Sequence, residues 1–225
     1  KKNYRADIID SNGNYLAKTV SSIDIGINPV EVIDKKKLLI NLQLIFPKKN
    51  FSTVKKKLNG SKFFYFEKKI TSDKYEKIML LGDKSIKQEE KLTRIYPQEN
   101  LFSHIIGQID DENKGISGIE MSFDEELKKI NKPLQLTVDS DIQFLIREEL
   151  VKFQPVFQNI GSSAILMDVN NGNILSMVSL PDFNLNKRES ITDVNYINRA
   201  TKGVYELGSV FKTFTIAAGL NEEVI

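Results

Sequence analysis

The 225-residue chain has no cysteine and one histidine, His104. The lack of cysteine excludes a disulfide framework and thiolate metal sites, and it leaves the cellular compartment open. No carboxylate stands near His104 at metal-ligand spacing. We therefore predict a structural histidine there, rather than a metal ligand or a general base.

Long apolar segments are also lacking. The best run, residues 38–46, is interrupted by Asn41 and Gln43 and is far shorter than the ~20 apolar residues that span a bilayer. No signal peptide is visible. Because the chain opens abruptly in KKNYRADIID, we expect it to be a piece of a longer protein.

An excess of one charge is missing too. The net charge is +2, which gives no sign of a nucleic-acid binder. Two lysine clusters, at residues 35–37 and 55–57, are short and mixed with apolar residues. We predict that both are solvated helix faces rather than phosphate-binding patches.

Arginine is scarce in a chain that otherwise uses lysine. Lysine supplies charge but lacks the planar, bidentate fork of a guanidinium group. Each arginine is therefore a candidate for a geometrically demanding contact, and the competing explanation is codon usage alone. The five arginines are Arg5, Arg94, Arg147, Arg188 and Arg199.

A boundary is predicted near Pro133. Residues 1–132 have the pattern of an α+β module, and residues 133–225 that of the start of an α/β domain. In the first part the predicted elements are a hairpin at Asn12-Gly13, a helix ending before Pro47, a strand over 62–70, a helix capped by Ser72 or Asp73, and an irregular or extended stretch over 92–107. In the second part they are a helix from Asp139 to about Phe153, a covered hairpin at Asn171-Gly172, a polar stretch over 181–202 and a final buried helix over 209–221.

The final helix begins with a serine and a lysine three positions apart, Ser209 and Lys212. Positions i and i+3 share a helix face. Apolar surroundings disfavour the charged form of a lysine, and a neutral amine beside a hydroxyl can accept its proton and create a nucleophile. This is chemistry for acyl transfer. The alternative is a helix-capping serine beside a solvated lysine, which is the better interpretation of the second Ser-x-x-Lys, at Ser52 and Lys55.

Seven blocks stand in order along nearly the whole chain: RADIIDSNG, RIYP, HIIG, GISGIEMSFDEEL, LTVDSDIQFLIREEL, AILMDVNNGNILSMVSLPDFNLN and NRATKGVYELGSVFK. Together they resemble the class B penicillin-binding proteins, the peptidoglycan D,D-transpeptidases. The departures are Ala6, Ser11 and Leu207 at family positions that commonly hold glycine, arginine and proline. The short link over 127–136 and VYELGS are more similar to the division-specific, septal branch than to the elongation branch.

The resemblance implies an N-terminal pedestal over 1–132 and the start of a penicillin-binding transpeptidase domain over 133–225. It implies that Ser209 is the nucleophile and Lys212 the general base, acting on stem peptides ending in D-Ala-D-Ala, and that β-lactams acylate the same serine. Neither a metal nor a cofactor is implied. In the pedestal it places three blocks together, so we predict that Arg5 or Arg94 pairs with Glu120; Tyr96 and Pro97 complete that motif.

The resemblance also carries expectations about the parent protein. It implies a single transmembrane helix upstream of Lys1, with these residues on the outer face of the bacterial cytoplasmic membrane. Partners would be cell-division and glycan-polymerase membrane proteins, and not nucleic acid. Two further active-site motifs of the family lie downstream of the nucleophile, whereas this chain ends 13 residues after Lys212. We therefore expect the chain alone to be poorly acylated.

Two alternatives remain open. One is that this chain is an interaction pedestal without catalysis of its own, which labelling with a fluorescent penicillin would distinguish. The other is a serine β-lactamase or β-lactam sensor, which the rate of deacylation would distinguish. The long N-terminal module with Arg94, Tyr96 and Pro97 disfavours the second alternative.

Overall fold

The computed structural model describes residues 4–187 and 193–225, so Arg188 lies outside the described residues. The chain forms two compact units. Of the described residues, the first comprises 4–9, 13–98 and 108–136, and the second 10–12, 99–107, 137–187 and 193–225. Nowhere in the described ranges does a helix reach the length and hydropathy of a membrane span.

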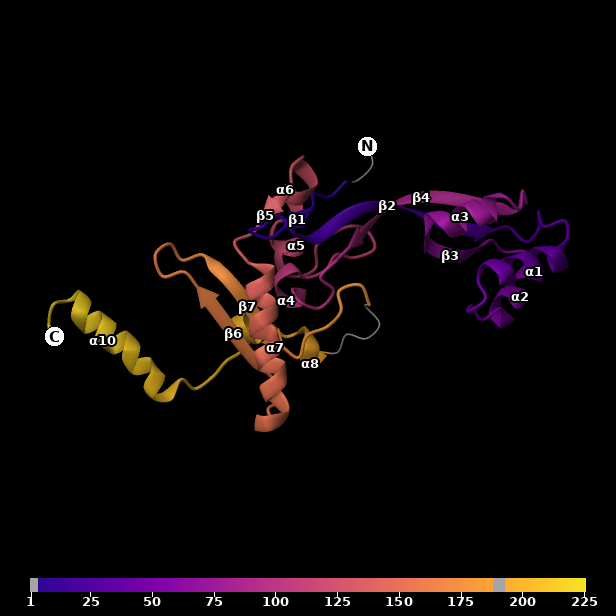
Figure 1. The fold of residues 1–225 in the computed structure, drawn as a ribbon. Helices are drawn as coiled ribbons and strands as arrows, with labels where there is room; N and C mark the ends of the chain where they lie inside the picture. Colours follow the sequence, from indigo (N-terminus) through magenta and orange to yellow (C-terminus); the bar gives the residue numbers. More distant parts are fainter. Residues whose placement is uncertain (1–3, 188–192) are drawn as a thin grey trace. The chain divides into compact units, whose positions relative to one another are not determined.

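The first unit is built on one long strand, β2 (Tyr15–Ile27) (Figure 1). Strand β4 (Ile86–Ile95) pairs antiparallel with it, from Lys18 opposite Ile95 to Ile27 opposite Ile86. The other edge of β2 is shared by two strands: β1 (Ile8–Ile9) pairs with its beginning and β3 (Phe64–Ile70) with its end. Strand β5 (Leu134–Gln135) then joins β1 in parallel.

The predicted elements of this unit are largely present, but β4 was missed. Residues 92–95 were expected to be irregular or extended, and they complete a ten-residue strand. The sequence of β4, IKQEEKLTRI, is rich in Lys and Glu, which have low strand propensity. Pairing with β2 along its whole length decides the conformation.

Residues 28–86 form a lobe at one end of the sheet. Its helices are α1 (Lys35–Ile45), α2 (Ser52–Leu58) and α3 (Ser72–Met79). Helix α1 starts at its cap Asp34, whose side chain accepts hydrogen bonds from the backbone N–H groups of Lys36 and Lys37. Thr71, rather than Ser72 or Asp73, precedes α3 as its cap residue. The lobe packs on the end of β2 through its own core: Ile25, Ile27, Val32, Leu38, Leu42, Phe46, Val54, Leu58, Phe64, Phe66 and Ile78.

Two short helices of the first unit lie beside its N-terminal segment. These are α5 (Gly118–Ser122) and α6 (Asp124–Lys129). Leu127 of α6 is fully buried, and its carbonyl accepts a hydrogen bond from the backbone N–H of Ala6. This contact brings α6 beside the N-terminal segment.

The second unit packs a long helix on a hairpin. Helix α7 (Ser140–Phe157) is capped by Asp139 and continues through Pro155, beyond the expected end near Phe153. It covers the hairpin of β6 (Ser162–Met167) and β7 (Ile174–Leu180). The short helix α4 (Ser103–Ile106) also contacts β7.

The hairpin was expected to be covered, and this holds only for β7. Val178 and Leu180 of β7 are buried, whereas Ile165 and Met167 of β6 are about half exposed. Helices α7 and α9 contact β6, yet its apolar side chains Ile165, Leu166 and Met167 all remain exposed. Apolar composition therefore predicted the strand correctly and its burial incorrectly.

Beyond the hairpin the chain continues through short helices. These are α8 (Asp193–Tyr196) and α9 (Arg199–Lys202), and α9 lies against both hairpin strands. A 3₁₀ helix (Gly208–Phe211) then leads directly into α10 (Lys212–Asn221).

Candidate functional site

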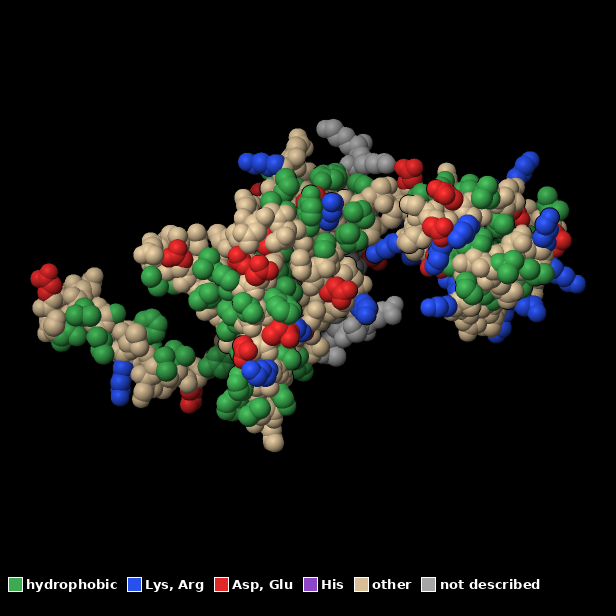
Figure 2. All heavy atoms as spheres, in the orientation of Figure 1, with side chains coloured by type: hydrophobic (Ala, Val, Ile, Leu, Met, Phe, Trp, Pro, Cys, Tyr) green, Lys and Arg blue, Asp and Glu red, His purple; other side chains and the backbone are tan. Residues whose placement is uncertain are grey.

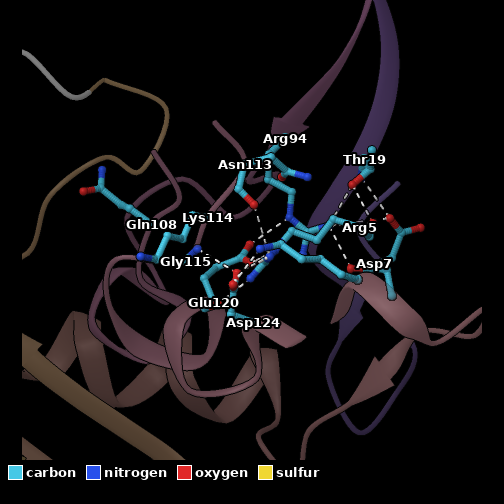
Figure 3. Close-up of polar contacts among 12 residues, drawn as sticks. Arg5, Asp7, Thr19, Arg94, Gln108, Asn113, Lys114, Gly115, Glu120 and Asp124 are labelled. Atoms are coloured by element: carbon cyan, nitrogen blue, oxygen red, sulfur yellow. Dashed lines mark hydrogen bonds and ion pairs between the residues drawn. The ribbon is translucent and has the colours of Figure 1, made fainter. Parts of the chain in front are cut away.

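Two groups of residues were predicted to carry function. One group is mostly buried in the structure and the other is exposed. The pedestal residues form a buried ionic cluster in the first unit (Figure 3). The serine–lysine pair lies in the second unit, at the start of α10.

Glu120 is the centre of the buried cluster. Its side chain is completely buried in α5 and receives one arginine on each oxygen. Arg5 Nε donates to Oε2 at 2.5 Å, and Arg94 Nε donates to Oε1 at 2.8 Å. The prediction that at least one arginine pairs with Glu120 is confirmed, since both do.

Arg5 uses its guanidinium group as a multiple donor. One Nη donates to Asp124 Oδ1 at 2.6 Å and to the carbonyl of Asn113 at 3.5 Å, and the other donates to the carbonyl of Glu120. A guanidinium group presents five N–H donors in a fixed plane, so it can hold several acceptors at once. A lysine could not reproduce this set of contacts.

Arg94 joins the end of β4 to the N-terminal segment. Its Nη1 donates to the carbonyl of Ala6 at 2.8 Å and to Thr19 Oγ1 at 2.9 Å. Thr19 Oγ1 in turn donates to the carbonyl of Arg5 at 2.7 Å. The cluster therefore connects three segments that are distant in sequence: the N-terminal segment, β4 and α5.

Asp124 is a cluster member that the sequence did not reveal. Burial raises the pKa of this carboxyl, but hydrogen bonds from Lys128, the Gly115 N–H and Arg5 outweigh burial and lower the pKa to about 2. Gly115 has a steric reason to be glycine, because a Cβ there would clash with the backbone of Glu120. The block GISGIEMSFDEEL contains both residues, but their contact depends on the fold.

The remaining predicted pedestal residues divide between core and surface. Tyr96 is buried just after β4, and Pro97 is exposed. The other arginines also make side-chain contacts: Arg147 Nε donates to Asp182 Oδ2 at 2.6 Å, and Arg199 Nη1 donates to the carbonyl of Val194 at 3.3 Å. Codon usage alone is thus a weak explanation for the described arginines.

His104 has a structural role, as predicted. Its Nε2 lies 2.7 Å from the carbonyl of Asn195, and its ring packs edge-on against Phe183. Because a carbonyl only accepts hydrogen bonds, Nε2 carries the proton. Burial lowers the pKa of His104, which favours the neutral ring.

The serine–lysine pair lies at a change of helix type. Gly208 has a φ of 54°, in the left-handed region that favours glycine, and it begins the 3₁₀ helix that contains Ser209. Lys212 is the first residue of α10. Ser209 was expected in the first turn of a helix, and it lies one turn before α10.

The expectation that Lys212 and its helix are buried is wrong for this structure. Every residue from Val204 to Ala218 is exposed, including Ser209 and Lys212. No strand or helix in the described ranges covers the apolar side chains of α10, such as Phe214 and Ile216. Apolar composition indicates that a helix can be buried, but burial requires a surface that packs against it.

The described residues offer no evident metal centre. Within the two described ranges, no group of three or more His, Asp and Glu side chains is arranged to hold an ion. The buried cluster supports the fold of the first unit. A chemical role for Ser209 and Lys212 stays a prediction.

Comparisons with known proteins give the family. Residues 1–156 match a family described as "Penicillin-binding Protein dimerisation domain", and residues 162–225 match "Penicillin binding protein transpeptidase domain". A crystal structure of a peptidoglycan synthetase from Bifidobacterium adolescentis covers all of this chain with a TM-score of 0.63 at 20% identity, and this chain covers 51% of it. That similarity supports the fold.

Curated relatives agree with the family match. The probable peptidoglycan D,D-transpeptidase FtsI of Caulobacter vibrioides is 33% identical over 98% of this chain, and stage V sporulation protein D of Bacillus subtilis is 29% identical over 98%. FtsI of Escherichia coli K12 is 26% identical over 98%. The chain spans about two fifths of the length of these relatives, 38%, 39% and 43% respectively. With both domains matched in order, the chain belongs to the class B penicillin-binding proteins.

Proposed function

We propose that this chain is part of a peptidoglycan D,D-transpeptidase that crosslinks stem peptides during cell division. The observation that carries the proposal is the Ser209-x-x-Lys212 pair, which lies inside the region matched to the transpeptidase domain. The division-specific assignment rests on the similarity to two proteins named FtsI. The pedestal is proposed to span 1–132 and the transpeptidase domain to begin at 133.

The proposed reaction is acyl transfer in two steps. Ser209 Oγ attacks the carbonyl carbon of the penultimate D-alanine while Lys212 Nζ accepts the hydroxyl proton. The amide C–N bond breaks, and terminal D-alanine leaves with a proton on its amine. An amine of a second stem peptide then attacks the serine ester, forms the crosslink and regenerates the hydroxyl of Ser209. β-Lactams would acylate Ser209 in place of the first stem peptide.

Backbone geometry supports Ser209 as the nucleophile. It lies in the 3₁₀ helix immediately before α10, near backbone N–H groups at a helix start. Such groups favour developing negative charge. We propose that the parent protein is anchored in the cytoplasmic membrane, with this chain on its outer side and with cell-division and glycan-polymerase proteins as partners.

A fluorescent penicillin tests the catalytic assignment in the protein that contains the complete transpeptidase domain. The expected result is a stable acyl-enzyme at Ser209, identified by mass spectrometry of the labelled peptide. Ser209→Ala should abolish labelling, whereas Ser52→Ala, in the second Ser-x-x-Lys, should leave it unchanged. Labelling at a different serine would refute the assignment, and rapid deacylation would instead indicate a β-lactamase.

An interaction role for the first unit is a second candidate. The core of the lobe and the buried cluster contain no residue of the Ser209 segment, so changes at Ser209 should leave this unit intact. A pull-down of division proteins with a Ser209→Ala parent would support this role if binding persists without acylation.

A further inference from the structure

The lobe concentrates positive charge that the rest of the chain does not have. Residues 28–86 contain 14 lysines and no arginine, against six Asp and Glu, which gives a net charge of +8 in a chain whose total is +2. Figure 2 shows blue side chains gathered over this lobe. The remainder of the chain is therefore acidic.

Most of these lysines are not explained by pairing within the chain. In the described residues, only Lys49 and Lys77 of the lobe form ion pairs, with Glu67 and Asp73. All six lysines of the clusters 35–37 and 55–57 are exposed and have no ion-pair partner among the described residues. Both clusters therefore face solvent, as predicted, and the choice between a solvated face and an anion-binding patch stays a prediction.

The lysine cluster at residues 35–37 also lies at a position where positive charge does not stabilise the helix. It occupies the first turn of α1, which has no acidic residue. The partial positive charge of a helix N-terminus disfavours cations there. Folding thus gives no reason for three successive lysines at this position, and a function outside the fold is the remaining explanation.

The outer face of α1 adds exposed apolar side chains to this charge. Leu38 and Leu42 face the core, while Ile40 and Leu44 on the other side are 56% and 75% exposed. Ile33, just before the helix, is 95% exposed. Spacings of three, four and seven residues put Lys37, Ile40 and Leu44 along one stripe of α1.

We propose that this face of α1, with the lysines of α1 and α2, docks on an anionic lipid surface. Lysine provides positive charge but lacks the planar guanidinium group that binds one carboxylate or phosphate in a fixed geometry. It therefore suits a partner recognised by its negative surface potential. Exposed aliphatic side chains close to lysines suit the interface of a bilayer. There the apolar side chains can enter the membrane surface while the ammonium groups contact the lipid headgroups. This inference does not depend on the proposed catalytic role.

Vesicle binding tests the proposal with the 225-residue chain. The probes are sedimented vesicles of phosphatidylcholine with about one third phosphatidylglycerol, and vesicles of phosphatidylcholine alone. Binding is expected only to the anionic vesicles, and it should weaken as salt rises because the Debye length shortens. The triple variant Lys35→Gln, Lys36→Gln, Lys37→Gln should bind about tenfold more weakly or worse.

A matched variant separates position from total charge. Lys129→Gln, Lys132→Gln, Lys152→Gln removes the same charge from exposed lysines outside the lobe and should keep the affinity of the unaltered chain. Equal loss in both triple variants would overturn the proposal. So would equal binding to neutral vesicles, or binding to soluble polyglutamate in the absence of any vesicle binding, which would indicate an acidic protein partner.

The lack of tryptophan provides a direct measure of insertion. Leu44→Trp places a single indole on the proposed stripe, and its emission should shift to the blue with anionic vesicles. Val169→Trp places one in an exposed turn of the second unit and should not shift. A shift at Val169→Trp without one at Leu44→Trp would show that a different surface binds the lipid.

Discussion

At the scale of single residues, the buried cluster shows how a charged side chain can be essential to a fold. Glu120 is fully buried with an arginine on each oxygen. Burying a charge is costly unless it is paired and hydrogen-bonded. Both arginines are buried too, so removing the central carboxylate leaves two cations without their shared partner.

We predict that Glu120→Gln lowers the free energy of unfolding by about 3 kcal/mol or more, as is typical when one partner of a buried ion pair is removed. Denaturant unfolding monitored by circular dichroism measures this change. Glu125→Gln is the matched control, because it removes an exposed carboxylate whose partner Lys129 lies 3.2 Å away. It should have little effect. Similar losses in both variants would contradict the argument.

His104 gives the second unit a dependence on pH. Burial lowers the pKa of the folded ring below 6.5, despite the carbonyl of Asn195 and the nearby Asp182, which raise it. The unfolded state therefore binds the proton more readily, and the stability from the neutral ring is present above pH 6.5 and lost as the pH falls. The loss can reach about 1.4 kcal/mol per pH unit.

We expect the free energy of unfolding to decrease between pH 7 and pH 5, and His104→Gln to reduce this slope. Unfolding by urea at several pH values measures both. Asp124 titrates near 2, far below this window, so its ion pair does not contribute to the slope. An unchanged slope in His104→Gln would assign the effect to other groups.

At the scale of elements, Gln143 joins α7 to two other segments of the second unit. Its Nε2 donates to the carbonyls of Leu101 and Met177, and its Oε1 accepts from Ser176 Oγ and the Met177 N–H. All of these distances lie between 2.7 and 3.0 Å. One buried amide therefore satisfies all its hydrogen-bonding capacity and fixes the helix on β7.

Gln143→Leu is predicted to destabilise the second unit by about 2–4 kcal/mol, since it leaves several buried polar groups without partners. Hydrogen exchange should show the loss first in residues 99–107, which Gln143 contacts through Leu101. Gln154→Leu makes the same change farther along α7, where the side chain is half-buried, and should not loosen that segment. Equal exchange in both variants would show that the amide contacts are not decisive.

At the scale of the whole molecule, the Ser209–Lys212 segment is present but not enclosed. All residues from Val204 to Ala218 are exposed. Catalysis of acyl transfer needs donors that are fixed around the developing oxyanion and protected from water. Loss of one such donor typically lowers the rate by about a hundredfold or more.

We therefore predict that the 225-residue chain alone is acylated slowly, if at all, by excess labelled penicillin. Intact-mass measurement over time tests this, with Ser209→Ala as the control for non-specific labelling. Rapid stoichiometric labelling that is absent from the control would show that the exposed segment is already arranged for catalysis.

The sequence by itself determined what depends on local chemistry. The Asp34 and Asp139 caps and the turns at Asn12-Gly13 and Asn171-Gly172 follow from residues close in the chain, and the family followed from ordered blocks. The pairing of Glu120 with arginine was predicted from the scarcity of arginine together with the family resemblance.

Only the tertiary structure decided what depends on distant partners. Strand β4 forms from Lys- and Glu-rich sequence because β2 pairs with it, and Asp124 and Gln143 acquire their roles from segments far away in the chain. The apolar strand β6 and helix α10 remain exposed, although their composition suits a core. Local sequence sets the conformational propensity of a segment and the hydrogen-bonding capacity of its side chains. Burial and strand pairing each require two surfaces in contact, and only the tertiary fold brings distant surfaces together.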